Sequence, residues 1–129
     1  EANDLAACNP ETRTTLVGNA RKATYLTSAV TAFQQVEEPW LRTAPYTEVN
    51  TWLRAIKGIG EWSALFVLLR GLGRLERVLS DDSSSGFSAE MHKAAERIYG
   101  PLTFGELQTL ATHYGRWQGY WGHYLRALR

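Results

Sequence analysis

The chain has 129 residues, 44% of them hydrophobic, which suits one globular domain with a sizeable core. Fourteen basic and thirteen acidic side chains give a net charge of +1, so the chain as a whole is not a polycation. Any binding to nucleic acid would depend on where the charges are placed and not on their total. A single cysteine, Cys8, excludes an internal disulfide and a four-cysteine iron–sulfur cluster, and the longest apolar run, Ala64 to Leu69, is shorter than the ~20 residues of a membrane span.

These features, together with the lack of a signal-peptide pattern at the start, predict a soluble protein of a reducing intracellular compartment, the cytoplasm, nucleoid or nucleus.

Along the chain, helix signals recur. Asn9-Pro10 is typical of an N-cap with proline at the first helical position, and Gly18 of the end of that helix. A second helix is expected from Asn19, with one apolar stripe formed by Ala23, Leu26, Val30 and Phe33.

The middle of the chain is divided by prolines. Pro39 and Pro45 bracket a break or a short turn of helix. Thr47 is expected to cap the next helix, whose apolar face consists of Val49, Trp52, Leu53 and Ile56.

The second half continues the helical pattern. A buried helix is expected from about Glu61 to Leu69, closed by Gly71 and Gly73, and a polar SDDSSSG loop leads to a helix over about 88–99. Thr103 and Glu106 match a capping box, and residues 118–128 form the last predicted helix. Because no segment alternates with period two, the predicted fold is all-α, a helical bundle.

The segment Lys57-Gly58-Ile59-Gly60 lies between two of these helices. Glycines let the backbone turn tightly and approach a partner, and the N–H groups that begin the second helix attract an anion such as a phosphate. Ile59 is expected to point inward and anchor this turn. The alternative is a plain helical hairpin that uses its glycines for tight packing.

The stretch LRAIKGIGEWSA (53–64) resembles the helix-hairpin-helix element of base-excision DNA glycosylases, in the branch of 3-methyladenine glycosylase II, which removes alkylated adenine. The family usually has proline where this chain has Lys57. LAACNPETRTTLVGNARKATYLTSAVTAF (5–33) resembles the two preceding family helices, and HYGRWQGYWGHYLRAL (113–128) resembles the closing one. The resemblance implies one domain over residues 1–129, with the helix-hairpin-helix motif at about 47–70.

The family domain has several more helices before the point matched by Leu5, and they carry the residue that wedges into the duplex. The resemblance therefore implies a partial domain. Either the chain is a fragment, or it is one chain of a two-part enzyme whose second chain supplies those helices.

The family hydrolyses the N-glycosidic bond with an aspartate in the loop after the hairpin's second helix. A carboxylate there stabilises the positive charge that builds on the sugar, or helps water to attack it. Asp82, 20 residues after Trp62, matches the spacing of the alkyladenine branch, and Asp81 is the second choice because a one-residue gap would exchange them. The alternative is that both are solvated loop or capping residues.

Family members that also cut the strand have a nucleophilic lysine where this chain has Trp62, so the resemblance implies a monofunctional enzyme that leaves an abasic site. Trp62, Trp117 and Tyr120 are the expected walls of a pocket for the flipped base, because electron-rich rings attract positively charged alkylated purines. The alternative is that these aromatic residues belong to the core.

The expected phosphate contacts are backbone N–H groups, with Lys57 as a charged helper; the residues are Lys57, Gly58, Ile59, Gly60, Glu61 and Trp62. The family's hairpin often holds a monovalent cation, Na+ or K+, which would map to the carbonyls of Arg54, Ile56 and Gly58. No other cofactor is expected, and the scattered histidines predict no transition-metal site.

The expected function is therefore excision of alkylated purines from double-stranded DNA. Two alternatives stay open: a non-catalytic module that binds DNA or a partner through the hairpin, and a purely structural helical domain.

Overall fold

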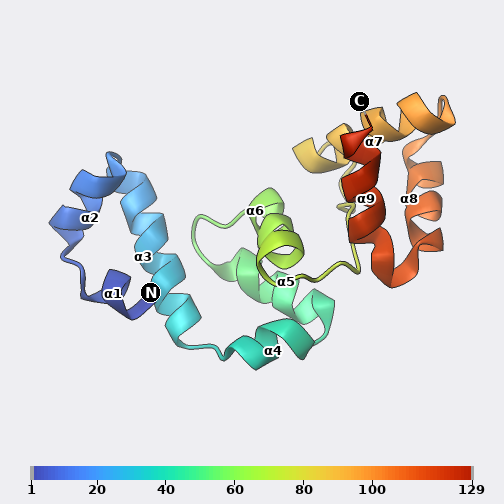
Figure 1. Cartoon of the computed structure of the whole chain (residues 1–129). Coiled ribbons are helices and arrows are strands. Elements are labelled where there is room, and N and C mark those ends of the chain that lie inside the picture. The colour runs from blue at the N-terminus through green and yellow to red at the C-terminus, as the bar shows by residue number, and fades with distance from the viewer. Residues whose placement is uncertain (1, 129) are drawn as a thin grey trace. The chain divides into compact units, whose positions relative to one another are not determined.

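The computed structural model describes residues 2–128, and within them every regular element is a helix, as the sequence predicts (Figure 1). The chain divides into two compact units, Glu1–Gly60 and Glu61–Arg129. Their boundary falls inside the predicted hairpin, so each side of the hairpin is described with its own unit.

Within residues 2–60, the structure has the helices α1 (Ala2–Ala7), α2 (Pro10–Val17), α3 (Ala20–Gln34), α4 (Glu38–Thr43) and α5 (Tyr46–Ala55). The predicted ends of α2 are confirmed. Asn9 accepts a hydrogen bond from the N–H of Glu11 at 2.7 Å, and Gly18 ends the helix in the left-handed region with a φ of 67°. Asn19 caps α3 by accepting from the N–H of Lys22 at 3.0 Å.

No sequence pattern indicated α1 or the arginine that holds the segment after it. Arg13 of α2 is buried, and its guanidinium donates twice to the carbonyl of Cys8, at 2.9 and 2.6 Å, and once to the hydroxyl of Thr27 in α3, at 2.7 Å. A buried guanidinium needs such partners, because its donors lose their hydration inside the protein. Arg13 thereby connects the segment after α1 to both α2 and α3.

The predicted cap of α5 is wrong by two residues. Pro45 occupies the N-cap position, and Thr47 lies inside the first turn. Proline suits the start of a helix because its φ is already close to the helical value. The apolar face is as expected, with Val49 and Leu53 fully buried, and the Trp52 ring meets its aromatic neighbours edge to face.

Unit 2 contains α6 (Glu61–Phe66), the π-helical turn η1 (Val67–Gly71), α7 (Gly86–Tyr99), α8 (Phe104–His113), the 3₁₀ turn η2 (Gly115–Trp117) and α9 (Gln118–Ala127). The capping box of α8 is present, because Thr103 accepts from the N–H of Glu106 and Glu106 accepts from the N–H of Thr103. The core of the unit packs α6, α7, α8 and α9 with the segment that follows η1. Its buried members are Leu65, Val78, Leu79, Phe87, Met91, Ala94, Ala95, Leu107, Ala111, Trp121 and Leu125.

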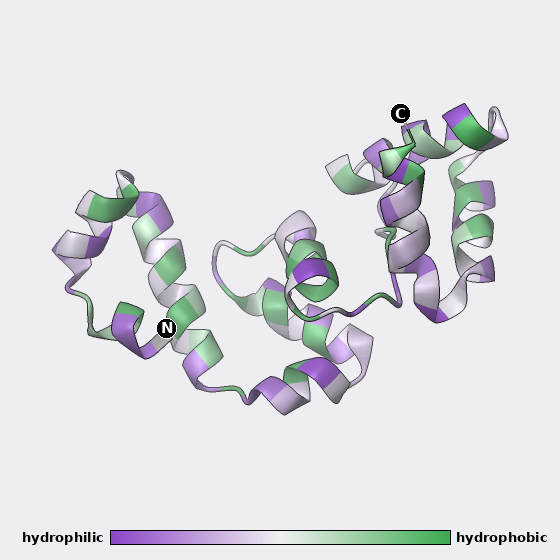
Figure 2. Cartoon of the chain, viewed as in Figure 1, coloured by the Kyte–Doolittle hydropathy of each residue, from purple (hydrophilic) through white to green (hydrophobic). Residues whose placement is uncertain are grey.

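The helix expected over 61–69 is neither uniform nor buried throughout. It changes to a π-helical turn at Val67, and Trp62 and Phe66 are exposed, whereas Ala64 and Leu68 are fully buried. Figure 2 shows hydrophobic and hydrophilic residues alternating around the helices. Across residues 2–128, none of the helices has the length and apolar character needed to span a membrane.

Candidate functional site

The turn after α5 is tight. Ile56 leaves the helix with an extended backbone, at φ −74° and ψ 124°, and its carbonyl accepts from the N–H of Ile59 at 3.0 Å. The expectation that Ile59 offers its N–H to a phosphate is therefore wrong, because the turn itself uses that donor. The Ile59 side chain is half-buried, and Lys57 is exposed.

The two glycines of the turn have different surroundings. Gly58 has a φ of +95°, and a Cβ there would lie 2.7 Å from Cβ of Tyr25 in α3 and closer still to the first ring carbon. Gly58 is therefore required by the fold, as the packing alternative predicts. At Gly60 the φ is ordinary and a Cβ would meet no atom within 4 Å. Packing therefore does not explain glycine at position 60.

The predicted cation ligands stay a prediction. Of the carbonyls of Arg54, Ile56 and Gly58, that of Ile56 already accepts one hydrogen bond, which leaves it a second lone pair. Among residues 2–128, no group of three or more histidine, cysteine, aspartate and glutamate side chains is arranged to hold a metal ion.

The structure distinguishes the two candidate aspartates. Asp81 forms an ion pair with Arg77, four residues earlier in the segment between η1 and α7. Asp82 instead accepts from the N–H and the hydroxyl of Ser84, at 2.8 and 2.7 Å. The hydroxyl of Ser84, followed by its N–H, lowers the pKa of Asp82 below its ordinary value. Asp82 is exposed and ionised at neutral pH, and among the described residues no cation pairs with it.

A short hydrogen-bond network holds the Asp82 loop against the first turn of α6. The hydroxyl of Ser80 donates to the carboxylate of Glu61, and it accepts from the N–H of Asp82 at 3.0 Å. The N–H of Ser80 donates to the hydroxyl of Ser88 in α7 at 3.1 Å. Ser80 and Ser88 are both buried, so the loop that carries Asp82 is fixed at its base to α6 and α7.

Replacing Ser84 by alanine is expected to raise the pKa of Asp82. The variant keeps the N–H donor but loses the hydroxyl, which is the larger cause of the lowered value. The measurement is an NMR titration of the Asp82 carboxyl carbon. Ser83→Ala, which changes an exposed hydroxyl in the same loop, is the control and should leave the titration unchanged. A pKa that does not move in Ser84→Ala would show that the hydroxyl bond is absent in solution.

The three predicted pocket aromatics are exposed, which contradicts the core alternative for them. Trp62 is 54% exposed and stacks on Phe66, with ring centroids 5.2 Å apart and planes at 15°. Sequence reasoning missed Phe66, although its position four residues after Trp62 places both rings on one helix face. The pair presents a flat aromatic surface at the start of unit 2.

Trp117 and Tyr120 form a second exposed pair, with ring centroids 5.8 Å apart. The guanidinium of Arg116 lies 4.6 Å from the centre of the Trp117 ring. A positively charged purine would have to compete with Arg116 for that ring. Trp121, by contrast, is buried, stacks on Tyr114 and donates from its indole nitrogen to Tyr99 at 3.2 Å.

Tyr120 also lines a cavity of about 330 Å³ inside unit 2. Its walls come from the end of η1, the following segment, the start of α7 and the start of α9. They are Leu69, Arg70, Gly73, Leu75, Val78, Phe87, Gly119, Tyr120, Gly122, His123 and Arg126. Neither Trp62 nor Trp117 lines this cavity, so the three predicted aromatics do not share it.

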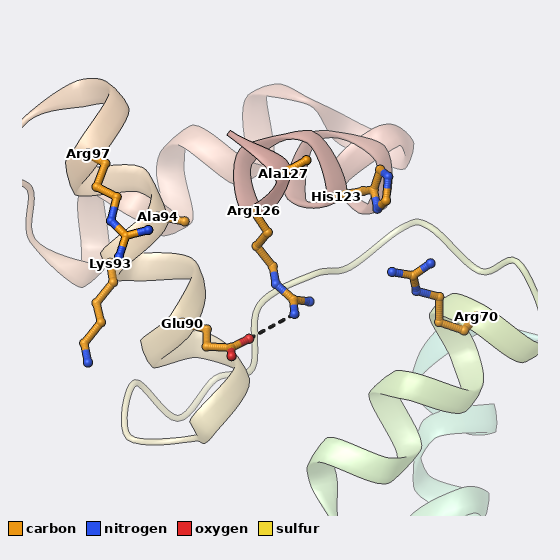
Figure 3. A pocket seen from close by; sticks show the side chains of 8 residues that line it. All are labelled: Arg70, Glu90, Lys93, Ala94, Arg97, His123, Arg126 and Ala127. Carbon is orange, nitrogen blue, oxygen red and sulfur yellow. Dashed lines mark ion pairs between the residues drawn. The ribbon is translucent and has the colours of Figure 1, made fainter. Parts of the chain in front are cut away.

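Next to this cavity lies a larger one, of about 480 Å³, that sequence reasoning missed (Figure 3). It is lined by Arg70, Glu90, Lys93, Ala94, Arg97, His123, Arg126 and Ala127, and the two cavities share Arg70, His123 and Arg126. The basic residues come from η1, α7 and α9, which are distant in sequence, and that is why no local motif pointed to them.

The chain was compared with family models, curated proteins and solved structures. No family model, curated protein or solved structure matches the chain.

Proposed function

We propose that the chain is a monofunctional DNA glycosylase that hydrolyses the N-glycosidic bond of alkylated purines in duplex DNA. The observation that carries the proposal is the difference between the two aspartates. Asp81 is neutralised by Arg77, whereas Asp82 is ionised, exposed and held by Ser84 in a loop fixed to α6. An ionised carboxylate with a lowered pKa suits the stabilisation of a developing cation and does not suit a general acid.

In the proposed reaction, the bond between the sugar and the damaged base breaks, and the electron pair leaves with the base. Asp82 stabilises the positive charge on the sugar, and water then adds to the sugar and loses one proton to the solvent, giving an abasic site and a free base. Trp62 supports the monofunctional assignment, because tryptophan has no amine to attack the sugar. The exposed rings of Trp62 and Phe66 are the proposed surface for the flipped base.

Contact with the duplex is assigned to the hairpin. Gly60 has no atom within 4 Å of an added Cβ, which leaves room for a phosphate to approach, and Lys57, three residues earlier, is exposed. The N–H groups of Gly58, Gly60, Glu61 and Trp62 are the proposed donors.

A second candidate is a module that binds DNA or a partner without catalysis. The observation in its favour is that Asp82, Trp62 and Tyr120 are all on the surface, and Trp62 does not line the cavity that includes Tyr120. Enzymes that act on a flipped base enclose it in a close-fitting pocket.

The experiment that tests the proposal is release of free base from alkylated duplex DNA, measured by chromatography of the released purines. The full chain alone is expected to release methylated purines faster than the spontaneous rate in a buffer blank. Undamaged duplex is the substrate control, and it should give no release above the blank. DNA binding without release from the alkylated duplex would contradict the enzyme and leave the binding module.

A further inference from the structure

The cavity of about 480 Å³ in unit 2 concentrates positive charge in a chain that is almost neutral overall. Four basic side chains and one carboxylate line it, so its net charge is three positive before His123 is counted, against +1 for the whole chain. Concave surfaces lined by one sign of charge focus the electrostatic potential and attract ligands of the opposite sign. The cavity is therefore an anion-binding candidate.

One basic residue of the cavity is held by a carboxylate, and two others are unpaired. Arg126 forms an ion pair with Glu90 at 3.1 Å, drawn as a dashed line in Figure 3, and its guanidinium lies 5.0 Å from the centre of the Phe87 ring. Lys93 and Arg97 are exposed, and within residues 2–128 neither forms an ion pair with a carboxylate. Two cations that are solvated and unpaired are available to a ligand at little desolvation cost.

The spacing of the free cations favours a chain of phosphates over a single small anion. Lys93 and Arg97 lie one turn apart on α7, about 6 Å along the helix axis. A DNA strand carries a phosphate every 3.4 Å of its axis, so two cations at this spacing can each meet a different phosphate of one strand.

The lining of the adjoining cavity favours a nucleic acid over an acidic protein as the ligand of the basic cavity. It shares Arg70, His123 and Arg126 with the basic cavity, and it is lined largely by apolar residues and by Tyr120. Basic grooves that continue into an aromatic surface are typical of proteins that hold a strand by its phosphates and stack its bases.

We propose that the basic cavity between η1, α7 and α9 is a second DNA-binding site, in which Lys93 and Arg97 bind backbone phosphates. The identity of the ligand depends on the proposed function, but the site is separate from the hairpin and from Asp82. Lys93 and Arg97 both lie on α7, outside the predicted helix-hairpin-helix range of 47–70. Glu90 limits the affinity of the site, because it neutralises Arg126.

The test measures binding of a fluorescent, undamaged DNA duplex to the full chain by anisotropy, between 50 and 200 mM salt. Lys93→Gln with Arg97→Gln is expected to weaken binding about 10- to 100-fold at 0.1 M salt and to reduce the slope of log affinity against log salt by about two. Arg21→Gln with Lys22→Gln, an equal charge change on an exposed part of α3, is the control and should leave the slope nearly unchanged.

Glu90→Gln is expected to change DNA affinity in the opposite direction. Removing the carboxylate frees Arg126, so DNA binding is expected to tighten by about 3- to 10-fold, as for one added phosphate contact. The control is Glu96→Gln, which removes the same charge from α7 at a position that does not line the cavity.

Equal effects of the cavity variants and their controls would overturn the site, since only total charge would then matter. Competition by a polyglutamate peptide as strong as that by DNA of equal charge would also overturn it, in favour of an acidic protein. Base release reports separately on the proposed reaction. A chain that releases no base but loses DNA affinity in Lys93→Gln with Arg97→Gln would contradict the reaction and support the site.

Discussion

Asp82→Asn is expected to reduce the rate of base release by roughly 10²- to 10³-fold, the range found when one preorganised electrostatic group is removed from an active site. Asparagine has nearly the same shape and can still accept from Ser84, so the loop should keep its conformation. It has no negative charge to stabilise the sugar cation. The measurement is single-turnover release of methylated purine, with DNA affinity determined in parallel and expected to change little.

Asp81→Asn is the matched control, because it removes the same charge from the neighbouring residue. Asp81 is exposed and its partner is Arg77, and such surface pairs contribute about 0–1 kcal/mol to stability. Base release by this variant should stay close to that of the wild type. Equal losses in both variants would show that only the net charge of the loop matters, and full activity of Asp82→Asn would contradict the catalytic assignment.

Gly58→Ala is expected to destabilise unit 1 by about 2–5 kcal/mol. Overpacking a close contact costs about 1–3 kcal/mol, and the left-handed backbone adds about 1–2 kcal/mol for a residue with a side chain. Both apply here, because the φ is +95° and the added Cβ would overlap Tyr25. The measurement is urea unfolding followed by far-ultraviolet circular dichroism.

Gly60→Ala is the matched control for stability and the informative variant for function. Since a Cβ there meets no atom within 4 Å, the free energy of unfolding should change by less than about 1 kcal/mol. If the turn approaches a phosphate, the added methyl group should still lower DNA affinity. Unchanged affinity in a stable Gly60→Ala variant would favour the plain structural connection over the DNA clamp, and a large loss of stability would contradict the open surroundings of Gly60.

The local sequence was enough to locate most helices, because their ends depend on residues a few positions apart. Capping residues satisfy backbone groups within three or four positions of themselves. The structure has all of the predicted caps at Asn9 with Pro10, at Gly18, and at Thr103 with Glu106. The apolar stripe of α5 was equally predictable, since side chains at helical spacing share one face. The exception is Thr47, because Pro45, two positions earlier, occupies the N-cap of this helix.

Only the tertiary structure decided which candidate residues are available for function. It pairs Asp81 with Arg77 and leaves Asp82 with Ser84, and it places Tyr25 against Gly58 while leaving Gly60 open. It also brings basic residues of η1, α7 and α9 around one cavity. The close contact and the cavity walls bring together residues that are distant in sequence, and they depend on how whole helices pack. The sequence by itself determined most of the helices and the candidate aspartates, glycines and tryptophans, whereas their partners, exposure and charge environment follow from contacts that no local pattern encodes.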